Sequence, residues 1–300
     1  MRPRSLKKGK KTETARASFP RSWPDRLRDG RWTLAVCGLA FLVYSRSLFC
    51  GFVRDDTPQI LRNRQVQSWE YLPQLLGTHL WSQLGQEVNV LFYRPIFSIW
   101  MLLVHTFGGL DPWFWHFSSI LLHVVATYLV FRLCQRLTRS DIGAAAAAAI
   151  FAVHPIHVDA VTWVSASCEV LFAIFALAAM LVLLNDDKHG KPRVWISAAL
   201  YCAGLFAKET GIAMLPILLV LAWAQRKDRV DGGRLRRFWE AAYPYGALTG
   251  AYLLVRWITV HRVGVETGEH SWTQVIFRVP TSCSFTSTNC SCRSGSAAAT

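Results

Sequence analysis

The 300 residues are 52% hydrophobic and only 17% charged, a balance that argues against a disordered chain and indicates a membrane protein. The 13 tryptophans suit anchoring at a membrane interface. The net charge of +14 does not indicate a nucleic-acid partner, because much of it lies in one polar N-terminal segment.

That segment, residues 1–31, is rich in Arg and Lys and lacks apolar periodicity. We expect it to be a disordered cytoplasmic tail that touches anionic lipid. A first apolar segment, residues 32–49, then has about the length needed to cross ~30 Å of hydrocarbon as a helix.

The long loop that follows contains residues 69–81, whose pattern predicts an amphipathic helix lying along the interface. The apolar stretch of residues 95–107 is short for a span. Counting it as a crossing would place the basic loops on the side opposite the basic N-terminus, so we predict a second interfacial helix instead.

Six further apolar segments complete an expected all-α, polytopic integral membrane protein with seven crossings. Pro155 and Pro216 should end or kink helices near one face. The six segments are residues 113–133, 142–153, 164–184, 194–206, 212–224 and 243–259.

The loops between the spans are of two kinds. Residues 132–139, 188–193 and 226–237 are basic, and cytoplasmic loops collect Lys and Arg. The other loops carry clusters of ionisable side chains, which should therefore share the outer face, where such groups indicate a functional site. The clusters are Arg54-Asp55-Asp56, His154-Pro155-Ile156-His157 with Asp159, and Lys208-Glu209-Thr210.

Each cluster has a chemical and a structural interpretation. In the Asp55-Asp56 pair, one carboxylate can serve as a general base toward a hydroxyl and either can hold a divalent metal; a solvated turn is the alternative. His154 and His157 can lie on one side of a turn with Asp159 orienting a ring, or can cap a helix. Two histidines and one aspartate are an incomplete ligand set for zinc, so we do not expect a zinc site here. The histidines predicted to be structural are His79, His105, His116 and His123.

Arg94, Lys208 and Arg256 are predicted near the outer face, where buried cations need an anionic partner. A lipid phosphate is the natural candidate, and the guanidinium of Arg94 can bind it with a forked contact. Alternatively, Lys208 pairs with Glu209, and Arg256 extends to the interface.

In their order along the chain, these signatures resemble the membrane domain of the transmembrane and tetratricopeptide-repeat proteins, which are similar to protein O-mannosyltransferases and belong to the GT-C glycosyltransferases. The resemblance covers residues 32–268, a GT-C-like membrane domain. The motifs are Phe52-Val53-Arg54-Asp55-Asp56, Tyr93-Arg94-Pro95, Phe151-Ala152-Val153-His154-Pro155-Ile156-His157-Val158-Asp159-Ala160-Val161 and Lys208-Glu209-Thr210-Gly211-Ile212.

The resemblance implies transfer of a hexose, mannose in particular, from a polyprenyl phosphate to a hydroxyl, commonly of a protein Ser or Thr. Asp55 or Asp56 would be the catalytic base, and Arg94, Lys208 and Arg256 would receive the donor phosphate. The site would face outward from a bacterial inner membrane, or into the lumen of the endoplasmic reticulum.

One stretch departs from the family pattern. After Trp163-Val164-Ser165 the pattern has a basic residue and an aspartate, whereas this chain has Ala166-Ser167-Cys168-Glu169. Glu169 replaces the acid, and with Glu209 we expect it at the outer-face site. The missing cation puts that subsite in doubt.

Residues 269–300 form an irregular tail. Codons for residue 281 onward can be chosen that encode an apolar segment in another frame, so we expect a frameshift; a disordered tail is the alternative. We expect the chain to be truncated before the later spans and the helical repeats of family members, so the resemblance implies activity for the full-length gene product rather than for this form. A transporter or scaffold would distribute charge through the membrane midplane. A transferase acting on lipid or glycan remains open, because nothing identifies the acceptor.

Overall fold

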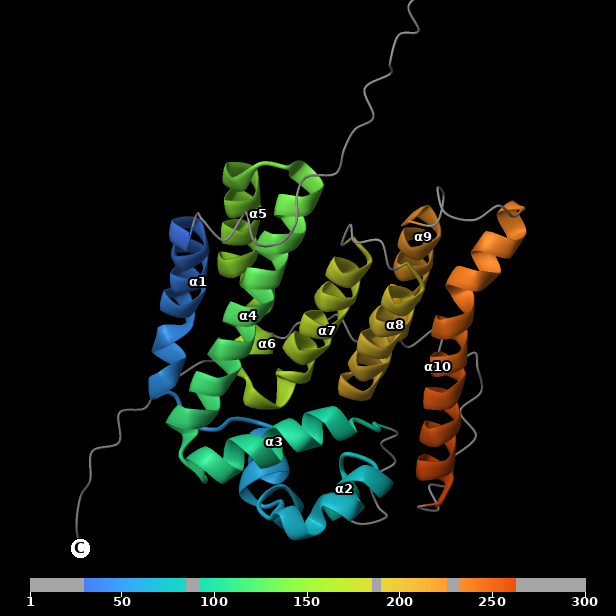
Figure 1. The fold of residues 1–300 in the computed structure, drawn as a ribbon. Coiled ribbons are helices and arrows are strands. Elements are labelled where there is room, and N and C mark those ends of the chain that lie inside the picture. The colour runs from blue at the N-terminus through green and yellow to red at the C-terminus, as the bar shows by residue number, and fades with distance from the viewer. Residues whose placement is uncertain (1–29, 85–91, 185–189, 226–232, 263–300) are drawn as a thin grey trace, which may run out of the picture.

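The computed structural model describes residues 30–84, 92–184, 190–225 and 233–262, and these residues form helices joined by short turns (Figure 1). The predicted all-α class is therefore confirmed. The expected basic tail, apart from its last two residues, and the irregular segment from residue 269 lie outside the described residues.

Most of the longer helices stand side by side in one bundle (Figure 1). The N-terminal helix α1 continues directly into a 3-10 turn, Ser45–Phe49. The helices of the bundle are α1 (Gly30–Tyr44), α4 (Pro112–Thr138), α5 (Asp141–Val153), α7 (Cys168–Leu183), α8 (Gly190–Ala207), α9 (Leu215–Gln225) and α10 (Arg234–Arg262).

Three helical segments in the described chain are long and apolar enough to cross a membrane: Gly30–Phe49, Pro112–Thr138 and Val164–Leu183. Asp141–Val153 and Pro155–Thr162 would form a fourth span if their 49° bend lies within one crossing. Pro155 stands at this bend, because proline cannot continue the hydrogen bonding of α5. The protein is thus polytopic, and the remaining crossings stay predictions.

The turn between α4 and α5 follows from local capping. Arg139, at the end of α4, adopts the left-handed conformation with φ 56°. Ser140 then accepts a hydrogen bond from the backbone N–H of Gly143 (3.1 Å), which caps the first turn of α5. Two long helices so joined must lie antiparallel, and alanines of α5 allow close packing against α1 and α4.

The predicted basic loop at residues 132–139 is wrong in one respect, because α4 continues to Thr138. Arg132 is nearly buried with its guanidinium near the Tyr128 ring, and Arg136 donates to the carbonyl oxygen of Leu184 (2.7 Å). These contacts give both arginines partners while they remain in the helix. The end of the apolar segment at residue 133 therefore placed the end of the helix too early.

Helix α3 (Pro95–Gly108) lies across the lower ends of the bundle helices, close to the short α2 (Leu72–Gly77) (Figure 1). This orientation agrees with the interfacial prediction rather than with a crossing. The indole N–H of Trp69 donates to Thr106 (2.8 Å), and Trp100 of α3 packs edge-on against Trp115 of α4. These contacts fix α3 against the bundle.

The predicted continuous helix over residues 69–81 is wrong, because α2 ends at Gly77. Thr78 has an extended backbone, and its hydroxyl donates to the carbonyl oxygen of Gln74 (2.7 Å). This side-chain bond satisfies a carbonyl at the helix end, after which the chain turns.

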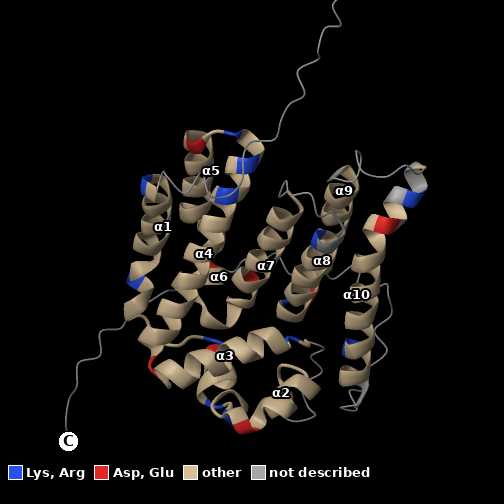
Figure 2. Ribbon diagram, in the orientation of Figure 1, with Lys and Arg blue, Asp and Glu red and all other residues tan. Residues whose placement is uncertain are grey.

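Charged residues gather at the two ends of the bundle in the described chain (Figure 2). The α4–α5 turn and the N-terminal end of α10 carry them at one end. At the other, they lie on the segments around α2 and α3 and where α8 and α10 approach them (Figure 2). The long middle sections of the helices are largely uncharged, as expected for segments surrounded by lipid.

Candidate functional site

Asp56 is completely buried and is held by three hydrogen bonds. One carboxylate oxygen accepts from the backbone N–H of Val53 (3.1 Å), and the other accepts from both the N–H (2.8 Å) and the hydroxyl (2.6 Å) of Ser165. The carboxylate therefore ties the loop after α1 to the turn before α7.

Asp55 differs from its neighbour. It is partly exposed, and within the described chain its carboxylate has no hydrogen bond or ion pair. Arg54, immediately before it, adopts the left-handed region with φ 47°, and its guanidinium lies 5.7 Å from the centre of the Trp163 ring. A non-glycine residue in this region is uncommon, and strained positions of this kind concentrate at functional sites.

Arg94 and Glu209 form a forked ion pair. The Nε–H and Nη2–H of Arg94 donate to the two carboxylate oxygens at 2.9 and 2.6 Å, and the two side chains are only 12% and 13% exposed. Arg94 Nη1 also lies 3.4 Å from Cys168 Sγ, and its guanidinium covers the ring of Phe92 at 4.4 Å. The guanidinium of Arg94 therefore has protein contacts on all its nitrogens and on its face.

Lys208 pairs with Glu169 rather than with the adjacent Glu209. The backbone of Lys208 is extended, with φ −156° and ψ 125°, so consecutive side chains point to opposite sides. Lys208 is 14% exposed and Glu169 is 49% exposed. The sequence alternative, a pair between residues 208 and 209, is therefore wrong.

Arg256 of α10 acts electrostatically on the same carboxylate, Glu209, and on Tyr252. Arg94, Lys208 and Arg256 thus come together around Glu209, although they lie on α3, the α8–α9 junction and α10. We call Arg94, Lys208, Arg256, Glu169 and Glu209 the cation cluster.

Burial and ion pairing oppose one another in this cluster. Burial alone would raise the pKa of Glu209, but the hydrogen bonds and charge of Arg94 outweigh it, so the pKa of Glu209 lies below its usual value. Burial is also the main reason that the pKa of Lys208 is lowered, and the positive charge of Arg94 acts in the same direction.

Residues 163–169 connect the cation cluster to the acid pair. Ser165 binds Asp56, Cys168 contacts Arg94, and Glu169 pairs with Lys208. The hydroxyls of Ser167 and Ser119 form a buried hydrogen bond of 2.8 Å. Sequence reasoning missed Ser165, Ser119 and Cys168, because isolated serines and cysteines carry no signal until the fold pairs them.

The histidine cluster has a structural arrangement. His154 Nδ1 accepts from the N–H of Ile156 (3.2 Å), which is the capping alternative, and the His157 ring lies 4.3 Å from the Phe151 ring. His123 Nε2 is 3.2 Å from the carbonyl oxygen of Ala152. Asp159 is exposed and makes no described hydrogen bond to either ring of the motif.

The described residues include no group of three or more His, Cys, Asp or Glu side chains arranged to hold a metal ion. Two other histidines that we predicted to be structural, His79 and His116, are 3% and 1% exposed. His105 lies in the last turn of α3.

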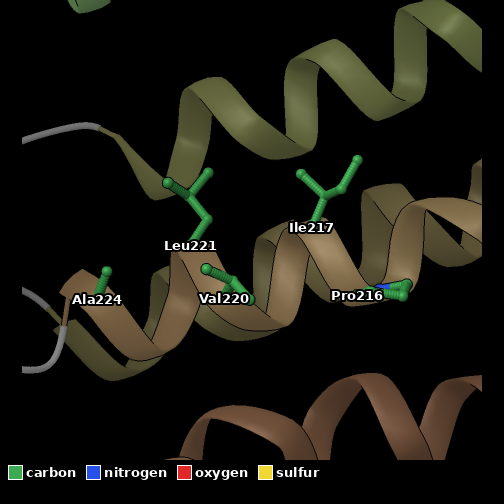
Figure 3. A pocket seen from close by; sticks show the side chains of 5 residues that line it. All are labelled: Pro216, Ile217, Val220, Leu221 and Ala224. Atoms are coloured by element: carbon green, nitrogen blue, oxygen red, sulfur yellow. The ribbon is translucent and has the colours of Figure 1, made fainter.

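An open apolar groove of about 430 Å³ runs along α9. Figure 3 shows Ile217 and Leu221 pointing toward a neighbouring helix, with Pro216, Val220 and Ala224 along the same stretch of α9. A 3-10 segment, Glu209–Met214, leads directly from Lys208 into α9, so the groove begins shortly after the cation cluster in the chain.

Comparison with known proteins gives three findings. The profile of the family described as dolichyl-phosphate-mannose-protein mannosyltransferase matches residues 94–257, more than half of the chain. Protein O-mannosyl-transferase Tmtc2 of Drosophila melanogaster is 34% identical over 213 residues, covering 68% of this chain and 23% of the relative. Protein O-mannosyl-transferase TMTC3 of Homo sapiens is 30% identical over 190 residues, covering 62% and 21%. The chain thus spans about a fifth to a quarter of these relatives, and no solved structure matches.

Proposed function

Because the chain belongs to the dolichyl-phosphate-mannose-protein mannosyltransferase family, we propose that it transfers mannose from a polyprenyl phosphate to a hydroxyl, that of a protein Ser or Thr in particular. The observation that carries this proposal is the meeting of Arg94, Lys208 and Arg256 in one cluster, connected through residues 163–169 to the Asp55-Asp56 pair.

The two aspartates would divide the work. Asp56 has no exposed surface and all its described contacts bind the protein itself, which suits a structural anchor. Asp55 is partly exposed with a free carboxylate in the described chain, which suits a general base. The strained Arg54 backbone and Trp163 would hold Asp55 in place.

In the proposed reaction, the acceptor oxygen forms a bond to the anomeric carbon of mannose while the bond from that carbon to the phosphate oxygen breaks. The hydroxyl proton moves to Asp55. The departing lipid phosphate gains a negative charge, so cations placed beside it stabilise the transition state more than the ground state. The cation cluster would supply this stabilisation.

The apolar groove on α9 supports a lipid-linked donor. A polyprenyl chain would make van der Waals contacts in the groove lined by Pro216, Ile217 and Val220 while its phosphate lies toward Lys208. A transporter is less well supported, since charge in the described chain gathers at the bundle ends rather than in the middle of the helices (Figure 2).

We also propose that the end of the bundle with the cation cluster faces the outside of a bacterial inner membrane or the lumen of the endoplasmic reticulum. Arg31, at the start of α1, and Arg136 and Arg139, at the end of α4, lie at the opposite end, and cytoplasmic segments collect arginine. In a background with all eight native cysteines replaced by serine, a membrane-impermeant thiol reagent should label Thr57→Cys and spare Ser140→Cys. Labelling of residue 140 from that side would reverse the orientation.

The proposal can be tested with the 300-residue chain purified in detergent, a polyprenyl-phosphate mannose donor and a Ser/Thr-rich acceptor peptide, with mass spectrometry of the peptide. Donor binding is the readout for this chain; in a longer form that adds hexose to the peptide, Asp55→Asn should reduce transfer by about 10²- to 10⁴-fold. Donor binding should persist in that variant. Absence of donor binding by the unaltered chain would contradict the proposal.

A further inference from the structure

The two ion pairs of the cation cluster differ in the number of their contacts and in their burial. In the Arg94–Glu209 pair both carboxylate oxygens are used, at 2.9 and 2.6 Å, and both side chains are nearly buried. Arg94 makes further contacts with Cys168 Sγ at 3.4 Å and with the face of Phe92. Opening this pair would leave two charges buried without partners, which is strongly unfavourable.

The Lys208–Glu169 pair is the weaker of the two. One oxygen of Glu169 meets the ammonium, and half of the Glu169 side chain is exposed to the surroundings. If this pair opens, the carboxylate can swing outward and become solvated. The Lys208 side chain is only 14% exposed, so its ammonium cannot be left without a partner, and another anion must take the place of the carboxylate when Glu169 moves out.

We propose that the phosphate of the lipid-linked donor binds Lys208 by displacing Glu169, while the Arg94–Glu209 pair stays closed as a fixed support. This inference rests on the proposed function and refines it. Arg94 becomes a positioning residue, whereas Lys208 contacts the phosphate directly.

The exchange also gives selectivity. Without donor, Glu169 and Glu209 neutralise the two cations that they contact, so a small anion must compete with Glu169 and gains no other binding energy. A lipid phosphate is held by its chain in the same micelle or membrane as Lys208, which raises its effective concentration at the site. Wild-type protein should therefore bind a polyprenyl monophosphate and largely ignore inorganic phosphate.

The test measures binding of a radiolabelled polyprenyl monophosphate to the 300-residue chain in detergent micelles, with neutral polyprenol and inorganic phosphate as separate probes. Glu169→Gln removes the competing charge and should tighten lipid-phosphate binding at least about twofold, since even an exposed pair contributes up to about 1 kcal/mol and Lys208 is nearly buried. It should also reveal binding of inorganic phosphate. Lys208→Met should weaken lipid-phosphate binding at least tenfold, and the double variant should match Lys208→Met.

Glu240→Gln is the matched control, because Glu240 also pairs with a cation, Arg236, but near the N-terminal end of α10, far along the helix from Arg256. It should bind like wild type. If Glu169→Gln binds the lipid monophosphate no more tightly than this control, the donor phosphate does not displace Glu169. The same conclusion follows if Glu209→Gln tightens binding instead. Neither result contradicts donor binding itself. If wild type binds the lipid monophosphate no better than neutral polyprenol, the proposed function fails, and the exchange fails with it.

Discussion

Asp56→Asn tests whether the second carboxylate of the acid pair is an anchor. The carboxylate accepts from Ser165 on one oxygen and from the N–H of Val53, at 3.1 Å, on the other. An asparagine has one oxygen and one NH₂ group. If its oxygen stays with Ser165, its amide nitrogen faces the Val53 N–H, and two donors then oppose one another at a fully buried position.

The magnitude follows from these contacts. A hydrogen bond to a charged group contributes about 1.5–3 kcal/mol, and a buried group left unsatisfied costs about 1–3 kcal/mol. The substitution weakens two bonds by removing the charge and breaks the third, so we expect the free energy of unfolding to fall by about 2–4 kcal/mol.

Denaturant unfolding of the purified protein in detergent micelles would measure this loss. Asp55→Asn is the matched control, since the Asp55 carboxylate has no described partner, and its unfolding free energy should stay within about 0.5 kcal/mol of wild type. Equal stability of Asp56→Asn and wild type would refute the anchor. An equally large loss in Asp55→Asn would refute the division of roles between the two aspartates.

Three further substitutions or conditions test the site. Ser165→Ala removes the 2.6 Å hydroxyl bond to Asp56 but keeps the backbone bond, so unfolding should weaken by about 2 kcal/mol; Ser118→Ala, which loses only a bond to a neutral carbonyl, should lose about half as much. Gly211→Ala places a Cβ 2.7 Å from the Phe172 ring, so its unfolding temperature should fall and Phe172→Leu should restore part of it; an unchanged temperature would contradict the close packing. Because the pKa of Glu209 is lowered in the folded protein, its stabilising contribution is present above the unfolded pKa of about 4.3 and is lost as pH falls through the lower folded value. Unfolding temperatures measured between pH 6 and pH 3 should therefore decline less steeply in Glu209→Gln than in wild type.

The helices were largely predictable because apolar runs and local caps both mark them. The turn Arg139-Ser140 separates α4 from α5, and Pro155 marks the bend after α5. Helix ends were harder to predict. Hydropathy falls at Arg132 and Arg136, yet both arginines find partners on the folded bundle and the helix continues.

The members of the cation cluster were predictable, but their pairing was not. Adjacent residues 208 and 209 suggest a local pair, and only the extended backbone at Lys208 separates them. Glu209 then meets Arg94 from 115 positions away. The partner of Asp56 is likewise distant, since Ser165 lies 109 positions along the chain. A local sequence pattern cannot predict such contacts, because they depend on how α3, α7 and α8 pack together.

The departure from the family pattern at residues 166–169 has a physical explanation in this packing. Ser167 has no exposed surface, and its hydroxyl bonds to Ser119, which is equally buried in α4. An arginine or lysine at position 167 would bring a charge into this buried contact and break the bond to Ser119. The serine therefore suits the neighbouring helix. In the proposed exchange, a phosphate would meet the positive charge of Lys208 and Arg256, supported by Arg94, and Glu169 at the end of the same turn is the group that it would displace.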